Sequence, residues 1–165
     1  EAGSDKILKV LNKGITTQQV KEAFQLTKKA NIPTLAYFII GNPTETRHDI
    51  QSSFDLIKEL RPDYLHLSIL IPFPGTQIYT QGLLSGQIQT DHWRQFANSP
   101  SIGFVPPHWD ECFSREELDA LIVKAYTRFY LRPSYILKRL LQLKSLGELA
   151  KNFRAGFKIA VMKRF

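Results

Sequence analysis

The sequence predicts an α/β fold with parallel strands, followed by a mainly helical region. Two runs rich in β-branched and aromatic residues, 34–40 and 64–71, each follow a segment with apolar residues at helical spacing. Helices and strands that alternate through short loops are typical of parallel α/β arrangements. After about residue 80 the pattern changes to scattered aromatic residues and then to helical periodicity alone. We therefore expect an α/β part over residues 1–80 and a helical extension over residues 81–165.

The expected helix boundaries follow from capping residues. Ser4 and Asp5 are expected to cap a short first helix that ends before Gly14. Later helices begin where Ser or Thr is followed three residues on by a side chain that can bond back to the free amides. These helix starts are Thr16, Thr46, Ser114 and Ser145, with a further start at Pro133.

The first strand is expected to be buried on both faces. The run 34–40 has little polar alternation, which suits a strand covered on both sides in a parallel sheet. Gly41 ends this run, and Pro72 ends the second. Two strands are too few for a closed barrel or a doubly wound sheet. The sequence therefore predicts a piece of a larger α/β structure.

The composition excludes several classes of function. The chain has 165 residues and one cysteine, Cys112. A single thiol forms no internal disulfide and cannot hold an iron–sulfur cluster alone, so we expect a packing residue. The four histidines lack the spacing of metal ligands, and no metal site is expected. No apolar run approaches the roughly 20 residues that span a bilayer, and no signal peptide is visible, which predicts a cytoplasmic protein.

The net charge of +7 is concentrated in the second half. Residues 91–165 hold 13 Lys and Arg against 7 Asp and Glu, whereas residues 1–90 hold 9 against 8. A basic final helix over 145–164 could meet a membrane surface, nucleic acid or an acidic partner. The solvated outer face of a packed helix explains the same pattern.

Two strand ends carry the residues of a candidate binding site. In α/β proteins ligands bind at the carboxyl ends of the strands, where loops converge. Gly41 lets a ligand approach the backbone, and the isoleucines before it offer apolar contact that suits an adenine ring. Glu45 is expected at the start of the next helix, near its free N–H groups. Ordinary strand-to-helix turns, with Glu45 as a helix cap, explain the same residues.

Four segments carry a family resemblance. They are 1–4 (EAGS), 8–14 (LKVLNKG), 38–46 (FIIGNPTET) and 72–76 (PFPGT). In this order and spacing they resemble radical S-adenosylmethionine enzymes, most of all the cobalamin-binding branch that includes the anaerobic magnesium-protoporphyrin ester cyclases. Residues 129–133 (FYLRP) are similar to a segment in the C-terminal extension of that branch. The resemblance implies the C-terminal fragment of a partial (βα)6 TIM-like barrel, followed by a helical extension.

The resemblance also implies a set of cofactor-binding residues. Seven positions match those that line the S-adenosylmethionine site: Glu1, Ile39, Ile40, Gly41, Glu45, Ile71 and Pro72. Glu1 corresponds to a contact with the ribose or methionine part, at the end of the fourth strand. Residues 39–41 correspond to the adenine-holding end of the fifth strand, and residues 71–72 to the end of the sixth. Glu45 corresponds to an acidic residue with a structural role.

The rest of the chemistry is implied to lie outside this chain. The [4Fe–4S] ligands, the glycine-rich turn that grips the methionine amino group and any cobalamin domain are expected upstream. The fragment is therefore expected to be inactive alone and to hold no catalytic residue. Ala36 or Tyr37 stands where many family members have a glycine. The parent is expected to be an iron–sulfur oxidoreductase or a methyltransferase with a small-molecule substrate, and the use of cobalamin is left open.

Two other functions fit parts of the sequence. The tRNA methylthiotransferases share several of these motifs, but they are expected to end in a small β-barrel RNA-binding domain, whereas this chain continues as helices. A non-catalytic basic helical module that binds membrane or nucleic acid is an alternative from another class. Four aromatic residues are candidates for a substrate pocket or for core packing: Tyr64, Tyr79, Trp93 and Trp109.

Overall fold

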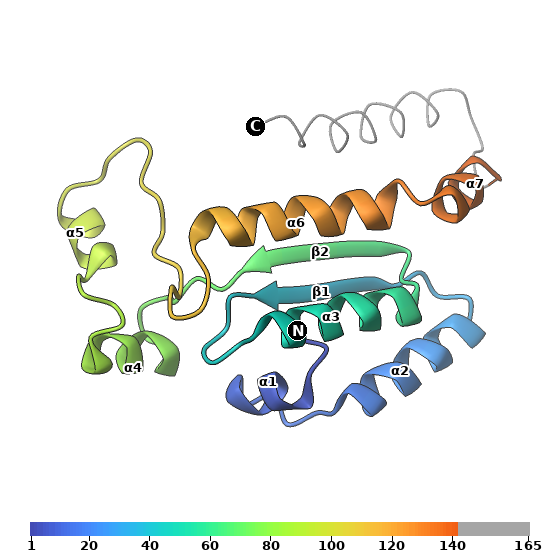
Figure 1. The fold of residues 1–165 in the computed structure, drawn as a ribbon, viewed down its shortest axis with the longest axis horizontal. Helices are drawn as coiled ribbons and strands as arrows, with labels where there is room; N and C mark the ends of the chain where they lie inside the picture. Colours follow the sequence, from blue (N-terminus) through green and yellow to red (C-terminus); the bar gives the residue numbers. More distant parts are fainter. Residues whose placement is uncertain (142–165) are drawn as a thin grey trace.

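Two parallel strands form the centre of the structure, a computed structural model that describes residues 1–141 (Figure 1). β1 (Leu35–Ile40) and β2 (Tyr64–Ile69) pair in register along their whole length. The predicted α/β class with parallel strands is confirmed, and within the described residues the sheet has these two strands. The predicted helix from Ser145, with the basic residues proposed to meet a membrane or nucleic acid, lies outside the described residues.

The helices begin where the capping residues predicted. Thr16, Thr46 and Ser114 each form a capping box with the residue three positions later. Ser4 stands at the N-cap position of α1 as predicted, but its hydroxyl donates to Asp49 at 2.8 Å and makes no cap hydrogen bond. No helix within residues 1–141 is both long and apolar enough to cross a membrane. The helices are α1 (Asp5–Val10), α2 (Thr17–Lys29), α3 (Arg47–Leu60), α4 (Gln77–Ser85), α5 (His92–Asn98), α6 (Arg115–Tyr130) and α7 (Pro133–Leu141).

One face of the sheet carries the core. Alternate residues of both strands, such as Phe38 and Leu67, are buried with apolar residues of α3 and α6. The other face is more exposed within the described part of the chain: Leu35 is 45%, Tyr37 57% and Tyr64 45% exposed, and Arg139 of α7 lies over the Tyr64 ring. The prediction that the run 34–40 is buried on both faces is therefore wrong for Leu35 and Tyr37. The apolar run supplies side chains to both faces, but α3 and α6 cover only one.

α6 seals the outer edge of β2 with two tyrosine hydroxyls. The Tyr126 hydroxyl accepts from the Leu67 N–H at 2.9 Å and donates to the Leu67 carbonyl at 3.2 Å. Tyr130 makes the same two bonds with Leu65, at 3.0 and 2.9 Å. The spacing fits, because four helix residues advance about 6 Å and two strand residues about 6.6 Å. The backbone groups that a further strand would use are therefore already bonded.

Removal of one of these hydroxyls should weaken the fold. Tyr130→Phe leaves both edge groups of Leu65 without their partner, so we expect a loss of about 1–2 kcal/mol in the free energy of unfolding. Urea denaturation followed by circular dichroism measures it. Tyr37→Phe is the matched control, because Tyr37 is largely exposed. Equal stabilities of the two variants would contradict the edge-sealing role.

The outer edge of β1 pairs with the first residue of the chain. The Glu1 amino group donates to the Tyr37 carbonyl at 2.8 Å, and the Glu1 carbonyl accepts from the Ile39 N–H at 2.9 Å. Two bonds that flank Phe38 in this way are the pattern of a parallel pair. Glu1 therefore continues the sheet on the side opposite to the sealed edge of β2.

Candidate functional site

The carboxyl ends of β1 and β2 lie side by side. The Leu70 N–H donates to the Ile40 carbonyl at 2.8 Å, so the pairing continues just past the last strand residues. Loop 41–46 leads from β1 into α3, and loop 70–76 leads from β2 into α4. α4 and α5 lie beyond this edge, in front of the arrowheads (Figure 1). This is the edge at which open α/β sheets bind ligands, and it holds six of the seven predicted site residues.

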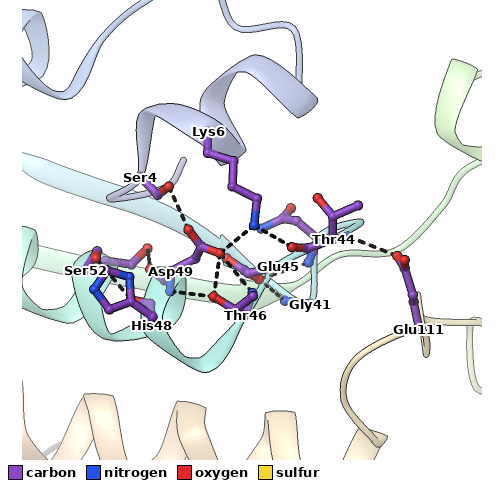
Figure 2. Close-up of polar contacts among 12 residues, drawn as sticks. Ser4, Lys6, Gly41, Thr44, Glu45, Thr46, His48, Asp49, Ser52 and Glu111 are labelled. Carbon is purple, nitrogen blue, oxygen red and sulfur yellow. Dashed lines mark hydrogen bonds and ion pairs between the residues drawn. The ribbon is translucent and has the colours of Figure 1, made fainter.

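A buried carboxylate shapes the loop after β1. Glu45 is fully buried, and its Oε2 accepts from the Gly41 N–H at 2.7 Å and the Asn42 N–H at 3.0 Å (Figure 2). Burial raises the pKa of Glu45 above its usual value, although hydrogen bonds from Asn42 and Gly41 oppose this. The expectation that Glu45 lies at the free amides of α3 is wrong. Thr46 and Asp49 cap that helix, so Glu45 turns back to the loop.

Gly41 has no room for a side chain. Its φ is +77°, which favours glycine, and a Cβ there would lie 2.8 Å from Leu118 Cδ1. Its amide is bonded to Glu45. The sequence predicted that a ligand would approach the backbone at this glycine. In the structure, Leu118 of α6 occupies the space where a Cβ of residue 41 would lie.

Asp49 joins α1 to the start of α3. Its side chain is 8% exposed. Oδ2 accepts from Lys6 Nζ at 2.9 Å and from the Thr46 N–H and hydroxyl at 3.0 and 2.7 Å, while Oδ1 accepts from the Ser4 hydroxyl at 2.8 Å. Burial alone would raise the pKa of Asp49, but the hydrogen bonds from Thr46, Lys6 and Ser4 hold that pKa well below its usual range.

Thr44 is held in a left-handed conformation by two charged side chains. Its φ is +58°, which costs an L-residue about 1–2 kcal/mol and is rare for a β-branched one. Lys6 Nζ donates to the Thr44 carbonyl at 2.7 Å, and the Thr44 N–H donates to Glu111 Oε2 at 3.0 Å (Figure 2). The same oxygen accepts from Trp109 Nε1–H at 2.9 Å. The hydrogen bonds from Trp109 and Thr44 lower the pKa of Glu111.

The loop after β2 is fixed by α5. Pro72 is buried, and its carbonyl accepts from Trp93 Nε1–H at 2.8 Å. The exposed ring of Phe73 lies 5.1 Å from that of Trp93, and Phe104 and Phe96 extend the cluster. Trp93 was a sequence candidate for a substrate pocket, and the structure gives it a hydrogen bond to a strand-end loop.

The seven predicted cofactor-binding residues divide by exposure. Glu1, Ile39 and Ile71 are partly exposed. Glu1 Oε2 is buried and has no hydrogen-bond partner among the described residues. Such an acceptor fits a hydroxyl or ammonium donor, as S-adenosylmethionine would bring, so this position suits the group. The side chains or backbone of the other four are buried: Ile40, Gly41, Glu45 and Pro72.

Other candidate positions lie apart from these loops. Cys112 is exposed, so its predicted packing role is wrong; the loop before α6 leaves it at the surface. No group of three or more His, Cys, Asp or Glu within residues 1–141 could hold a metal ion. A pocket of about 390 Å³ lies between residues 86–92 and 107–110, with His92 and His108 in its wall. Its lining contains none of the seven predicted residues.

Comparison with known proteins gives relatives that cover most of the chain, while no protein-family model matches it. The chain is 33% identical over 138 residues to an uncharacterized methyltransferase of Pyrococcus horikoshii, which is 84% of this chain and 29% of that protein. It is 29% identical over 133 residues to an anaerobic magnesium-protoporphyrin IX monomethyl ester cyclase of Cereibacter sphaeroides, 80% of this chain and 20% of that protein. A tRNA-2-methylthio-N(6)-dimethylallyladenosine synthase of Petrotoga mobilis is 36% identical over 81 residues, 48% of this chain and 18% of that protein.

The printed names of these relatives agree with the family that the sequence resembles. The chain spans less than a third of the length of each of them. The methyltransferase and the cyclase match four fifths or more of the chain, whereas the methylthio-adenosine synthase matches about half. The resemblance stated from the sequence is therefore confirmed, and the chain belongs with the radical S-adenosylmethionine enzymes.

Proposed function

We propose that this chain supplies the adenosyl-binding strand ends of its parent enzyme. In this proposal β1 and β2 are the fifth and sixth strands of a partial (βα)6 barrel that includes residues 1–80, and residues 81–165 are its helical extension. The more exposed sheet face carries the proposal. A barrel wall has helices on its outer side and leaves its inner side for ligand and the other strands, as the exposed side chains of β1 and β2 do here.

The partly exposed residues are the ones that touch the cofactor in this proposal. Glu1 accepts hydrogen bonds from the ribose or the ammonium group through its free carboxylate oxygen. Ile39 and Ile71 give apolar contact to the adenine ring. The remaining predicted residues set the shape of the loops without touching the cofactor through their side chains: Ile40, Gly41, Glu45 and Pro72.

The chain's own residues bind, orient and exclude water, and none of them transfers a proton. S-adenosylmethionine and a reduced [4Fe–4S] cluster, when both are bound, would supply radical hydrogen-abstraction chemistry at this site. The ligands of the cluster, and of cobalamin where the parent uses it, lie in the preceding part of the parent. The fragment is therefore inactive alone. The parent is an iron–sulfur oxidoreductase or a methyltransferase that acts on a small molecule.

A methylthiotransferase parent is the second candidate. The 36% identity to the tRNA-modifying relative favours it over the region that aligns, which is 48% of the chain. The methyltransferase and cyclase relatives also align over much of the second half, since their matches cover 84% and 80%. This wider coverage favours the first candidate.

Cofactor binding by the full-length protein tests the proposal. The protein is purified without oxygen, its cluster is reconstituted, and the dissociation constant of S-adenosylmethionine is measured by equilibrium dialysis. Ile39→Glu places a carboxylate against the adenine, so we expect binding to weaken about tenfold or more. Leu26→Glu is the matched control, because Leu26 is 65% exposed on α2, and it should bind as the unchanged protein does.

The outcomes separate the parts of the proposal. Formation of 5′-deoxyadenosine only in the presence of cluster, S-adenosylmethionine and reductant would support the radical chemistry of the parent. Failure of the cluster-loaded protein to bind S-adenosylmethionine would overturn the proposed function. Equal binding by Ile39→Glu and Leu26→Glu would remove the end of β1 from the cofactor site.

A further inference from the structure

The loop after β1 depends on a residue far along the chain. Thr44 has the only left-handed φ of a non-glycine residue in this loop, +58°. Its N–H is bonded to Glu111, which is 67 positions away, and its carbonyl is bonded to Lys6, which is 38 positions away. The two sides of one residue are therefore held from opposite directions, one from α1 and one from the segment before α6 (Figure 2).

Glu111 is well placed to hold this conformation. Its Oε2 takes two hydrogen bonds, from the Thr44 N–H and from Trp109 Nε1–H. The hydrogen bond from the indole of Trp109, which lies two residues earlier in the chain, orients the Glu111 carboxylate. An acceptor held in this way is oriented before it meets the loop, which reduces the freedom that the contact must remove.

The same segment braces the loop at two further points. Leu118, in the first turn of α6, packs where a Cβ on Gly41 would be. Glu117 forms an ion pair with Arg47, the first residue of α3. Residues 111–118 thus contact the beginning, the middle and the end of the turn that joins β1 to α3. Ile39, one of the two residues proposed to touch adenine, lies two positions before Gly41, where this turn begins.

We propose that Glu111 is a positioning residue for the cofactor site. It holds the Thr44 peptide in its left-handed conformation and so keeps the end of β1 in the geometry that receives S-adenosylmethionine. The inference rests on the proposed function for its ligand. It assigns to the helical extension a part in shaping a site that the motifs place in the first 80 residues.

Three variants of the full-length, cluster-loaded protein test this role. Glu111→Ala removes the acceptor, and we expect S-adenosylmethionine to bind about tenfold more weakly. Glu111→Gln keeps a carbonyl oxygen for both donors, so binding should stay within about twofold of the unchanged protein. Thr44→Gly combined with Glu111→Ala should restore most of the affinity, because glycine adopts the left-handed conformation without help.

Hydrogen exchange gives a second readout that needs no cofactor. The Thr44 amide should exchange about tenfold or more faster in Glu111→Ala and at nearly the original rate in Glu111→Gln. Unchanged exchange and unchanged binding in Glu111→Ala would overturn the proposal. Equal weakening by Ala and Gln would also overturn it, because the charge rather than the held geometry would then matter.

The two proposals fail in different ways. If the unchanged protein binds no S-adenosylmethionine, the proposed function falls, while the exchange of the Thr44 amide still tests the contact made by Glu111. If the unchanged protein binds and Glu111→Ala binds equally well, only the positioning role falls. A uniform rise in exchange across β1 and α3 in Glu111→Ala would show a general loss of structure and would contradict a local role.

Discussion

Replacement of Gly3 by alanine is expected to destabilise the chain by about 3–4 kcal/mol. A Cβ at this position would lie 2.4 Å from the Ser52 carbonyl oxygen and 2.4 Å from Ser53 Cα. Both are backbone atoms of α3 and cannot rotate away. The start of α1 would have to move off α3 and break the bond from the Gly3 N–H to Ser53 Oγ, which is 2.8 Å long. Urea denaturation followed by circular dichroism measures the loss.

Gly14→Ala separates this steric effect from backbone strain. Gly14 has a φ of +65°, and nothing lies within 4 Å of the Cβ that alanine would add. We expect a loss of about 1 kcal/mol from the left-handed conformation alone. A Gly3→Ala variant that lost no more than Gly14→Ala would mean that α1 can separate from α3 without consequence.

Replacement of Asp49 is expected to have the second large effect. Asp49→Ala removes the acceptor of four hydrogen bonds from Ser4, Lys6 and Thr46, so we expect a loss of about 3 kcal/mol at neutral pH. Asp49→Asn keeps one acceptor oxygen and removes the charge, and should lose about 1–2 kcal/mol. The free energy of unfolding in urea measures both. Asp55→Asn, at an exposed position of the same helix, is the control and should change little.

The contribution of Asp49 should also depend on pH. Its pKa is lower in the folded state than the value of about 3.9 for an unfolded chain, so the stabilisation is complete above that value and is lost as the pH falls through the folded pKa. Glu45 acts in the opposite direction. Its pKa is raised in the folded state, so its contribution to the free energy of unfolding increases as the pH falls. The stability difference between the unchanged chain and Asp49→Asn should therefore shrink below about pH 4. A constant difference down to low pH would contradict the role of the charge.

Local patterns predicted both strands and most helices, but gave no bounds for the helices between residues 77 and 113, where α4 and α5 lie. A capping box needs only two residues three positions apart, so Thr16 and Ser114 marked the starts of α2 and α6 correctly. Gly41 marked the end of β1 for the same reason, because it changes the backbone at its own position, whereas β2 ends at Ile69, two residues before the predicted end at Ile71. What failed was the prediction of burial. An apolar run shows that both faces of a strand can be covered, but not which described elements cover them.

The supports of the candidate site could not be predicted in this way. The bonds from Lys6 to Asp49 and from Glu111 to Thr44 join residues 43 and 67 positions apart. Lys6 and Glu111 belong to no local sequence pattern that would identify their partners. Those partners depend on how α1 and the segment before α6 pack against the loop after β1. One signal was available for the sealed edge of β2. Tyrosines four apart, at 126 and 130, match the strand repeat, but many helices carry such pairs for packing alone.

The two edges of this sheet differ in which backbone groups are already hydrogen-bonded, and this determines the edge at which a further strand can add. On the β2 side, the hydroxyls of Tyr126 and Tyr130 use up backbone groups that would otherwise recruit another strand. On the β1 side, the backbone of Glu1 pairs with Tyr37 and Ile39 in the pattern of a parallel strand. Growth of the sheet is therefore possible from one side only. A strand added to this sheet, whether from the same protein or from another molecule, would therefore pair at the β1 edge.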